Sequence, residues 1–284
     1  MSKTAVITGV TGQDGSHLAD LLLEKGYIVV GLMRRTSTEP PSRMRKHLWE
    51  NVIQFPGDVT DSYSIESVLK QYQPDEFYNL AAQSHVGTSW KQPEETSRVD
   101  YFGVLNILKG IQLISPHTRF YQASTSEMFG KVEDEYQNEK SRFYPRSPYA
   151  VAKLAAYWLT VNYRESYGLF ACSGILFNHE GPRRGRDFVT RKITDHVAKY
   201  KLGKTTEPLQ LGNLNSISSF QNSNYRSRTI ISARNSKDLN MATLRLLLIL
   251  IALNAFTHEN VRSILNLTWY FSSSNLNFGP LFRW

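Results

Sequence analysis

Apolar residues along the first 180 positions follow two alternating patterns. Short β-branched and aliphatic runs are typical of buried strands, and apolar residues three and four apart are typical of a helix face. The first pattern predicts strands at 4–8, 27–33, 51–55, 75–80, 119–124 and 170–177. The second predicts helices at 64–71, 93–114 and 149–163, and an earlier helix with Leu18, Ala19, Leu21, Leu22 and Leu23 on its inner face. The inner face of the 93–114 helix is expected to hold Val99, Phe102, Val104, Leu105, Leu108 and Ile111.

Strands that alternate with helices at this pace imply parallel βαβ crossovers. They predict an α/β fold, a doubly wound parallel sheet of the Rossmann-like class. We assign residues 1–180 to a dinucleotide-binding domain and residues 181–214 to the start of a second, smaller substrate domain that is incomplete here. In such sheets the chemistry lies beyond the carboxyl ends of the strands.

The first strand leads into three glycines at a spacing of three: Gly9, Gly12 and Gly15. Glycine lets the backbone turn tightly and approach phosphates, and a helix N-terminus that follows offers unpaired N–H groups. Glycine-punctuated loops without a ligand are common. The position of this one, at the first strand–helix junction, favours a pyrophosphate cradle.

The second strand ends in Arg34, Arg35 and Ser37. This point of a nucleotide-binding sheet usually carries an acid for the ribose 2′-hydroxyl, and arginine there favours the 2′-phosphate of NADP. The alternative is a solvated basic loop, because further basic residues follow at 43–46. The arginines favour NADP over NAD.

Two polar clusters fall where a doubly wound sheet places its chemistry. The first follows the fifth strand and contains Thr125 and Glu127; the second is Tyr149 with Lys153, at a helix start. A spacing of four puts the phenol and the ammonium on one helix face. We expect the ammonium to lower the pKa of Tyr149, so that the phenol acts as a base near neutral pH.

Glu127 has two interpretations. A glutamate at a strand-to-loop corner is usually a solvated cap. The neighbouring hydroxyls of Thr125 and Ser126 favour catalysis instead. To serve as base and then as acid, Glu127 needs burial or neighbours that share its proton.

Composition excludes some partners. The net charge is +8, but residues 215–284 carry seven Lys and Arg against two acids, so only +3 belongs to residues 1–214. A mildly basic body indicates a small anionic ligand and no nucleic acid. The single cysteine, Cys172, excludes an internal disulfide, suggests a reducing and hence cytoplasmic compartment, and is expected to be inert packing. We expect no signal peptide and no membrane span, since the apolar run 244–253 is too short.

The glycine turn with Tyr149-x-x-x-Lys153 resembles the extended short-chain dehydrogenase/reductases, which act on nucleotide sugars. Thr125-Ser126-Glu127 narrows the resemblance to the 4,6-dehydratases of that group. Over residues 1–214 the chain is similar to the GDP-mannose 4,6-dehydratase family. Further motifs that carry this similarity are Gly9-Val-Thr-Gly-Gln-Asp14, Arg34-Arg35-x-Ser37, Gln83-Ser84-His85-Val86, Asn178-His179-Glu180, Pro182-Arg183-Arg184-Gly185 and Phe188-Val-Thr-Arg-Lys-Ile193.

The resemblance implies a lyase that converts GDP-mannose to GDP-4-keto-6-deoxymannose with NADP, on the way to GDP-fucose. The reaction oxidises C4, eliminates water across C5–C6 and returns the hydride to C6. By this resemblance Tyr149 takes the proton of the 4-hydroxyl and Glu127 removes the C5 proton. Thr125 hydrogen-bonds O4, and Lys153 holds the ribose and tunes Tyr149.

The resemblance also implies binding residues and assembly. The implied cofactor residues are Gly9, Val10, Thr11, Gly12, Gln13, Asp14, Gly15, Arg34, Arg35, Ser37, Asp58, Val59, Leu80, Ala81, Ala82, Gln83, Ser84, Lys153, His179 and Arg184. The implied substrate residues are Ser84, His85, Asn178, Val189 and Lys192, with no metal. A homo-oligomer, dimer or tetramer, is implied as well. The family commonly has a tyrosine cofactor contact where this chain has Glu95, so a weaker affinity for NADP is expected and no site is assigned to Glu95.

The resemblance stops near residue 215. Residues 215–240 hold seven Ser and five Asn without a clear period, which is typical of loop or disorder. We expect residues 215–284 to be a non-native or disordered tail from a retained intron or a shifted reading frame. Two alternatives to the dehydratase therefore stay open: another nucleotide-sugar dehydratase or epimerase, and a truncated NADP-binding protein without activity.

Overall fold

The structure is a computed structural model that describes residues 2–34, 46–132, 137–138, 140–211 and 221–222. Within these residues six parallel strands form one sheet in the order β3-β2-β1-β4-β5-β6. The strands are β1 (Thr4–Thr8), β2 (Ile28–Met33), β3 (Ile53–Pro56), β4 (Glu76–Asn79), β5 (Arg119–Thr125) and β6 (Ala171–Leu176). The predicted doubly wound parallel sheet is confirmed, and each predicted strand overlaps an observed one.

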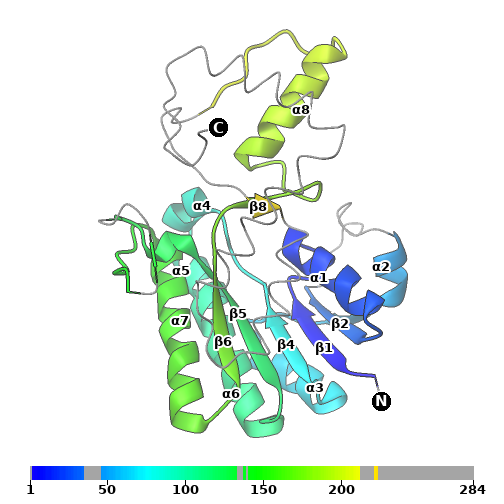
Figure 1. Cartoon of the computed structure of the whole chain (residues 1–284), viewed down its shortest axis with the longest axis vertical. Coiled ribbons are helices and arrows are strands. Elements are labelled where there is room, and N and C mark those ends of the chain that lie inside the picture. The colour runs from blue at the N-terminus through cyan, green and yellow to red at the C-terminus, as the bar shows by residue number, and fades with distance from the viewer. Residues whose placement is uncertain (1, 35–45, 133–136, 139, 212–220, 223–284) are drawn as a thin grey trace, which may run out of the picture. The chain divides into compact units, whose positions relative to one another are not determined.

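Helices connect the strands. They are α1 (Gln13–Glu24), α2 (Lys46–Asn51), α3 (Ser62–Tyr72), α4 (Val86–Lys91), α5 (Pro93–Ser97), α6 (Gly103–Ile114) and α7 (Pro148–Tyr167). On one side of the sheet α6 packs between α3 and α7, and Figure 1 shows α6 and α7 running alongside the strands. The short helices α2 and α4 were not predicted, because neither is long enough to show a helical apolar period.

Local sequence determines where the best-defined helices begin and end. Asp61 caps α3 by accepting the N–H groups of Tyr63 and Ser64. The Ser147 side chain accepts the N–H of Ala150, and the proline at 148 occupies the first turn of α7. The same helix ends at Gly168, whose φ of +68° suits glycine. These caps fix the start of the helix that carries Tyr149.

The core lies between the sheet and the layer of α3, α6 and α7. Val6, Phe77 and Phe120 from three neighbouring strands pack there with Ile65 and Ile107 from the helices. Side chains alternate along a strand, so the neighbours of Val6 in β1 face the opposite side of the sheet. The apolar runs of the sequence are thus buried on both faces, as parallel sheets require.

The predicted helix at 93–114 is not one regular helix. It consists of α5, one wide π-helical turn, η1 (Arg98–Phe102), and α6. A π turn adds one residue to the helical repeat and rotates the residues around it. The prediction that Phe102 faces inward is therefore wrong, since its side chain is 51% exposed, and Asp100 is buried instead.

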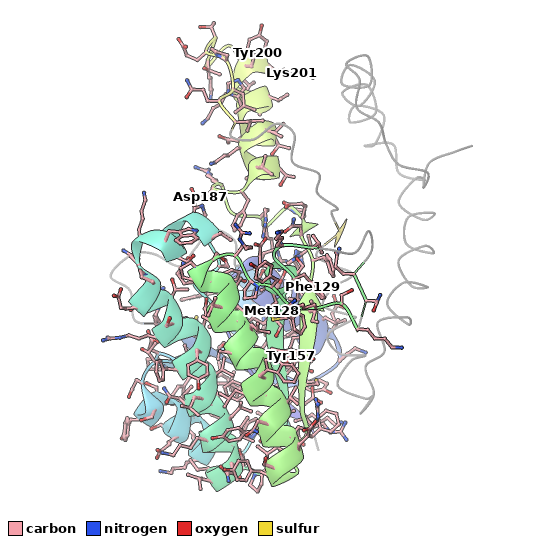
Figure 2. All side chains as sticks on the ribbon, turned by 90° about the vertical axis from the view of Figure 1, so that its left-hand side faces the viewer. Met128, Phe129, Tyr157, Asp187, Tyr200 and Lys201 are labelled. Carbon is pink, nitrogen blue, oxygen red and sulfur yellow. The ribbon has the colours of Figure 1, made fainter. Side chains whose placement is uncertain are left out.

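The chain after β6 forms a small second region. β7 (His179–Glu180) pairs in parallel with β8 (Gln221–Asn222), and α8 (Val189–Lys201) follows β7. No residue of α8 is buried, and Tyr200 and Lys201 project from its C-terminal end (Figure 2). Among the described residues no helix is long and apolar enough to cross a membrane. The predicted run 244–253 and the rest of the tail beyond residue 222 lie outside the described residues.

Candidate active site

The glycine turn has the shape that a pyrophosphate cradle needs. Gly9 has a φ of +67°, and a Cβ there would lie 2.8 Å from the backbone of Leu80 and Ala81. A Cβ on Gly15 would lie 2.3 Å from the carbonyl oxygen of Gly9. Gly12 precedes α1 and brings no capping side chain to the N–H groups of the first turn. The turn therefore fits a dinucleotide phosphate, because backbone rather than side chains faces the site.

A cavity of about 1660 Å³ extends from this turn along the carboxyl ends of the strands. It contains most of the predicted site. The predicted residues that line it are Gly9, Thr11, Gly12, Gln13, Asp14, Gly15, Arg34, Asp58, Val59, Leu80, Ala81, Ala82, Gln83, Ser84, His85, Thr125, Glu127, Tyr149, Lys153, Asn178, His179, Arg184, Val189 and Lys192. Arg35 and Ser37 lie outside the described residues. Val10 is fully buried and does not line the cavity, so any cofactor contact at Val10 would come from its backbone.

The loop after β4 is held by side chains around it. The Thr8 hydroxyl accepts the N–H groups of Leu80 and Ala81, each at 3.1 Å. The amide of Gln83 donates to the Thr96 hydroxyl at 3.1 Å, and its oxygen accepts the N–H of His85 at 2.9 Å. This loop is one wall of the cavity, and its shape is set before any ligand binds.

Tyr149, Thr125 and Lys153 all line the cavity, and Tyr149 and Lys153 share one face of α7, as their spacing of four predicted. All three are buried, and the side chain of Thr125 hydrogen-bonds the Tyr149 phenol. Thr125 also accepts the backbone N–H of Glu127 at 3.2 Å, which fixes the turn η2 (Ser126–Met128). Glu127 lines the same cavity but is exposed, so the burial expected for an acid–base role is not present.

The pKa of Tyr149 moves in the opposite direction to the one expected. Burial raises this pKa most, and the negative charge of Asp100 raises it further. The hydrogen bond from Thr125 and the positive charge of Arg184 act the other way but do not compensate. The sequence prediction was wrong because the helical spacing shows which groups share a face and does not show how deeply the phenol is buried.

Aromatic rings support the turn that carries Glu127. The ring of Phe143 lies 5.1 Å from that of Phe129 and 5.4 Å from that of Tyr157, and Phe129 also stacks 6.2 Å from Phe177. Figure 2 shows Tyr157 on α7 and Phe129 beside that helix. Such pairs restrict side-chain motion as well as burying apolar area. Glu127 is thus exposed on a rigid turn.

Ion pairs tie the second region to the glycine turn. His179 places Nε2 2.7 Å from the Asp14 carboxylate and Nδ1 2.9 Å from the carbonyl oxygen of Phe177. Arg183 donates to Asp20 of α1 at 2.5 Å. The guanidinium carbon of the next arginine, Arg184, lies 3.5 Å from the centre of the Phe188 ring, over its face. The expected placement of His179 and Arg184 at one cavity is therefore observed.

Burial raises the pKa of two further titratable groups, Cys172 and Asp100. Cys172 in β6 is mostly buried, burial raises the pKa of its thiol to about 12, and the thiol lies 3.6 Å from the carbonyl oxygen of Phe120. Asp100, which sequence reasoning missed, is buried beside Lys153. The one feature of the sequence that pointed to Asp100 was its position as an acid inside a predicted helix, among apolar neighbours. Among the described residues no group of three His, Cys, Asp or Glu side chains could hold a metal ion.

Strand order, glycine turn and the Tyr149–Lys153 pair in one cavity define a Rossmann-type protein of the short-chain dehydrogenase/reductase class. Solved structures with this fold include dTDP-glucose 4,6-dehydratase from Bacillus anthracis in complex with NAD (TM-score 0.72, 18% identity, 84% of this chain and 73% of that chain). UDP-glucose 4-epimerase from Thermus thermophilus in complex with NAD is also similar (TM-score 0.70, 25% identity, 83% of this chain and 75% of that chain).

Within that class, the family model for GDP-mannose 4,6-dehydratase matches residues 6–247. The chain is 53% identical over 224 residues to the GDP-mannose 4,6-dehydratase of Yersinia enterocolitica, covering 76% of this chain and 60% of the relative. It is 50% identical over 221 residues to the human GDP-mannose 4,6-dehydratase, covering 75% and 59%. The chain belongs to the GDP-mannose 4,6-dehydratase family. It spans about 60% of the length of these curated relatives.

Proposed function

We propose that the chain is an NADP-dependent GDP-mannose 4,6-dehydratase that forms GDP-4-keto-6-deoxymannose, on the way to GDP-fucose. One observation carries the proposal: Tyr149, Thr125 and Glu127 face the same cavity as the glycine turn. A nucleotide sugar can therefore present its hexose to a phenol and a carboxylate at once. The family relationship supports mannose on GDP as the sugar.

The chain's own residues divide the chemistry between them. Bound nicotinamide would supply a hydride acceptor for C4 and a hydride donor for C6. Tyr149 would receive the proton of the 4-hydroxyl, which requires its phenol to ionise although burial and the charge of Asp100 raise its pKa, and the Thr125 hydroxyl would hold O4. Once C4 is a ketone the C5 proton is acidic, and Glu127 removes it as the C6 hydroxyl leaves with a proton as water. Glu127 lines the cavity beside Thr125, and the proton that Tyr149 took from the 4-hydroxyl would go to C5 when C6 accepts the hydride.

The cofactor residues support NADP. The described end of β2 presents Arg34, exposed at the cavity, where NAD sites usually have an acid. A guanidinium pairs with a 2′-phosphate in two hydrogen bonds. His179 and Arg184, from the second region, line the same cavity. Asn178 and Val189 of that region line it as well. Calorimetric titration with NADP⁺ and NAD⁺ checks this, and tighter binding of NAD⁺ would contradict it.

The test of the activity is product formation. Purified chain with NADP⁺ and GDP-mannose is expected to give a 4-keto-6-deoxy sugar nucleotide, detected by mass spectrometry as a loss of one water. UDP-glucose and dTDP-glucose are the matched controls, and turnover of either instead of GDP-mannose indicates another dehydratase or epimerase. Tyr149→Phe keeps the ring and removes the proton acceptor, so it is expected to abolish turnover while NADP⁺ still binds.

A second candidate is an NADP-binding protein without activity. It is favoured by α8, whose residues are all at least partly exposed, so that this part of the sugar side is loosely packed. Orientation of the sugar over the cofactor supplies much of the rate, and a loosely packed sugar side would lose it. Tight NADP⁺ binding with no product, unchanged in Tyr149→Phe, would establish this candidate.

We also infer a homo-oligomer, dimer or tetramer, in a cytoplasmic, reducing compartment. Apolar side chains gather on the outer side of α7 and on the neighbouring π turn: Val151 is 54% exposed, Trp158 56% and Phe102 about half. A second copy would cover them by apolar burial. Light scattering is expected to give the molar mass of a dimer or a larger oligomer. The Trp158→Glu substitution is expected to lower that mass toward the mass of a monomer. A wild-type monomer at micromolar concentration would contradict the inference.

A further inference from the structure

A row of buried polar side chains crosses the sheet near the carboxyl ends of its strands. The register of the strands places Thr8 of β1 beside Asn79 of β4, and Asn79 beside Gln122 of β5. Each of these three side chains is at most 1% exposed, whereas the row two residues earlier on the same strands is apolar. A buried polar group costs free energy unless it is hydrogen-bonded, so this polar row needs partners.

Each member of the polar row is hydrogen-bonded to the next. The Thr8 hydroxyl donates to Asn79 Oδ1 at 2.5 Å, and Asn79 Nδ2 donates to Gln122 Oε1 at 2.8 Å. Gln122 Nε2 then donates to the carbonyl oxygen of Ala123 at 3.0 Å. At the other end the Thr8 hydroxyl accepts two backbone N–H groups of the loop after β4. The polar row is therefore hydrogen-bonded from one end to the other.

Backbone groups at both ends fix the direction of these hydrogen bonds. The two loop N–H groups can only donate, so the single hydroxyl hydrogen of Thr8 is left for Asn79, which must present its oxygen. The carbonyl of Ala123 can only accept, so Gln122 must present its amino group to it. Between these ends Asn79 donates to Gln122. Position 122 therefore needs a neutral group that accepts on one side and donates on the other.

The polar row ends at two walls of the cavity. At one end it holds the loop after β4, which lies so close to Gly9 that a Cβ there would be 2.8 Å from the loop backbone. At the other end Ala123 lies two residues before Thr125, whose side chain hydrogen-bonds the Tyr149 phenol. Gln122 itself does not line the cavity, so it can act on a ligand only through these neighbours.

We propose that Gln122 is a positioning residue of this site: by accepting from Asn79 and donating to Ala123, its amide couples the loop after β4 to the strand end that carries Thr125. The proposal rests on the proposed function, which assigns the loop to the cofactor and Thr125 to O4 of the sugar. The coupling needs no substrate, so it can be measured on the chain alone.

The test replaces the amide by its acid. In Gln122→Glu a neutral carboxyl group can accept from Asn79 with one oxygen and donate to Ala123 with the other, as the amide does. Once ionised it can only accept, and its charge faces the Ala123 carbonyl without a hydrogen between them. Because burial delays ionisation, we expect a neutral carboxyl at about pH 5 and an ionised one toward about pH 9.

The measurement is hydrogen exchange of the two loop amides, Leu80 and Ala81, at single-residue resolution and relative to wild type at the same pH. Exchange in Gln122→Glu is expected to equal wild type at about pH 5 and to be about tenfold faster at about pH 9. Gln122→Met keeps the length of the side chain and removes both hydrogen bonds. It is expected to exchange faster at both pH values.

Gln54→Glu is the matched control. It makes the same chemical change on β3, where an exposed amide likewise donates to a backbone carbonyl, that of Trp49 at 3.0 Å. It is expected to leave exchange of the two loop amides unchanged at both pH values. Wild type is the reference at each pH, because Asp100 holds the same loop through the Gln83 N–H and has a pKa of about 6.

Two results overturn the coupling. One is loop exchange in Gln122→Glu that equals wild type at both pH values, and the other is exchange that is equally fast at both. If the Gln122 variants do not fold, the wild type decides. Its Gln122 side-chain amide, identified by its nuclear Overhauser effect to Asn79, is expected to exchange as slowly as the backbone of β5. Exchange as fast as that of the exposed Gln54 amide overturns the proposal.

Calorimetric titration with NADP⁺ shows whether the coupling reaches the site. Gln122→Glu is expected to bind NADP⁺ as wild type does at about pH 5 and about tenfold more weakly at about pH 9. Altered exchange with unchanged affinity would make the polar row a support of the sheet alone and overturn the positioning role. A wild type that forms no product from GDP-mannose refutes the proposed function instead, and the exchange measurement still decides the coupling.

Discussion

The sheet half and the region after β6 are stabilised in different ways. In the sheet half, strands and helices bury a continuous apolar core that includes Phe77, Phe120 and Ile107. In the second region, α8 buries none of its residues. Its described links to the sheet half include the ion pair of Arg183 with Asp20, the contact of the His179 ring with the Asp14 carboxylate, and the stacking of the Phe177 ring on Phe129. A continuous apolar core therefore holds the sheet half, whereas individual polar and ring contacts link the second region to it.

This difference bears on function. Apolar burial supplies most of the free energy of folding, whereas partly exposed ion pairs contribute little and mainly fix position. Most of the proposed cofactor residues belong to the well-packed half, although His179 and Arg184 lie after β6, and the proposed substrate residues Asn178, Val189 and Lys192 belong to the other. Cofactor binding is thus expected to tolerate changes at these three substrate positions that abolish sugar binding.

The largest expected effect is in the core. Phe120→Ala removes a buried ring that packs 6.2 Å from Phe77 and leaves a cavity between the sheet and α6. We expect the free energy of unfolding to fall by about 3–5 kcal/mol. Urea unfolding followed by circular dichroism measures it, with the exposed Tyr167→Ala as the control. A loss below about 1 kcal/mol would show that the sheet half is not packed as described.

The next largest expected change in the free energy of unfolding is an increase, and it also comes from a residue of the sheet half. The pKa of Asp100 is about 6 in the folded chain against an ordinary 3.8, so the folded state holds this proton more tightly. Stability therefore falls as the pH rises from about 4 to 6, and by pH 7 the ionised acid costs about 3 kcal/mol. Asp100→Asn is expected to unfold at higher urea concentration than wild type at pH 7 and at nearly equal concentration at pH 4. Lower stability of the variant at pH 7 would contradict this.

A smaller effect tests the polar link. Arg183→Met keeps the apolar stem but leaves Asp20 without its 2.5 Å partner, and the pair is largely buried. We expect a local loss of about 2 kcal/mol, because Asp20 retains some exposure to water. Hydrogen exchange is expected to quicken in 181–201 and not in β4 or β5. The exposed neighbour Arg186→Met is the control, and equal exchange in both variants would mean that the ion pair does not hold the region.

The sequence predicts the two halves unequally, for the same physical reason. The central strands of the sheet half, such as β1 and β2, are recoverable because they are apolar runs buried on both faces, and the glycine turn follows from its spacing. The π turn was missed, because one extra residue in a helix changes no composition and rotates Phe102 outward. In the second region α8 carries Val189, Ile193 and Val197 four residues apart, an apolar helical period that was overlooked, although none of these residues is buried.

The site shows the same limit. Spacing placed Tyr149 and Lys153 on one helix face, and family motifs placed Thr125 and Glu127 beside them. Neither showed that burial would outweigh a nearby ammonium in setting the pKa of Tyr149. The burial of Asp100 depends on the π turn, so its one signal, an acid inside a helical stretch, was not enough to show it. Contacts that depend on depth, or on one turn of geometry, need coordinates.

The smallest expected effect is on α8, and it tests the comparison most directly. Tyr200 is 63% exposed near the end of this helix (Figure 2), so Tyr200→Ala removes few contacts. We expect the free energy of unfolding to change by less than about 0.5 kcal/mol. A loss above about 1 kcal/mol in the same urea experiment would mean that another surface covers α8 in solution. Concentration dependence then identifies that surface, because a second copy of the chain makes the loss smaller on dilution and a segment of the same chain does not.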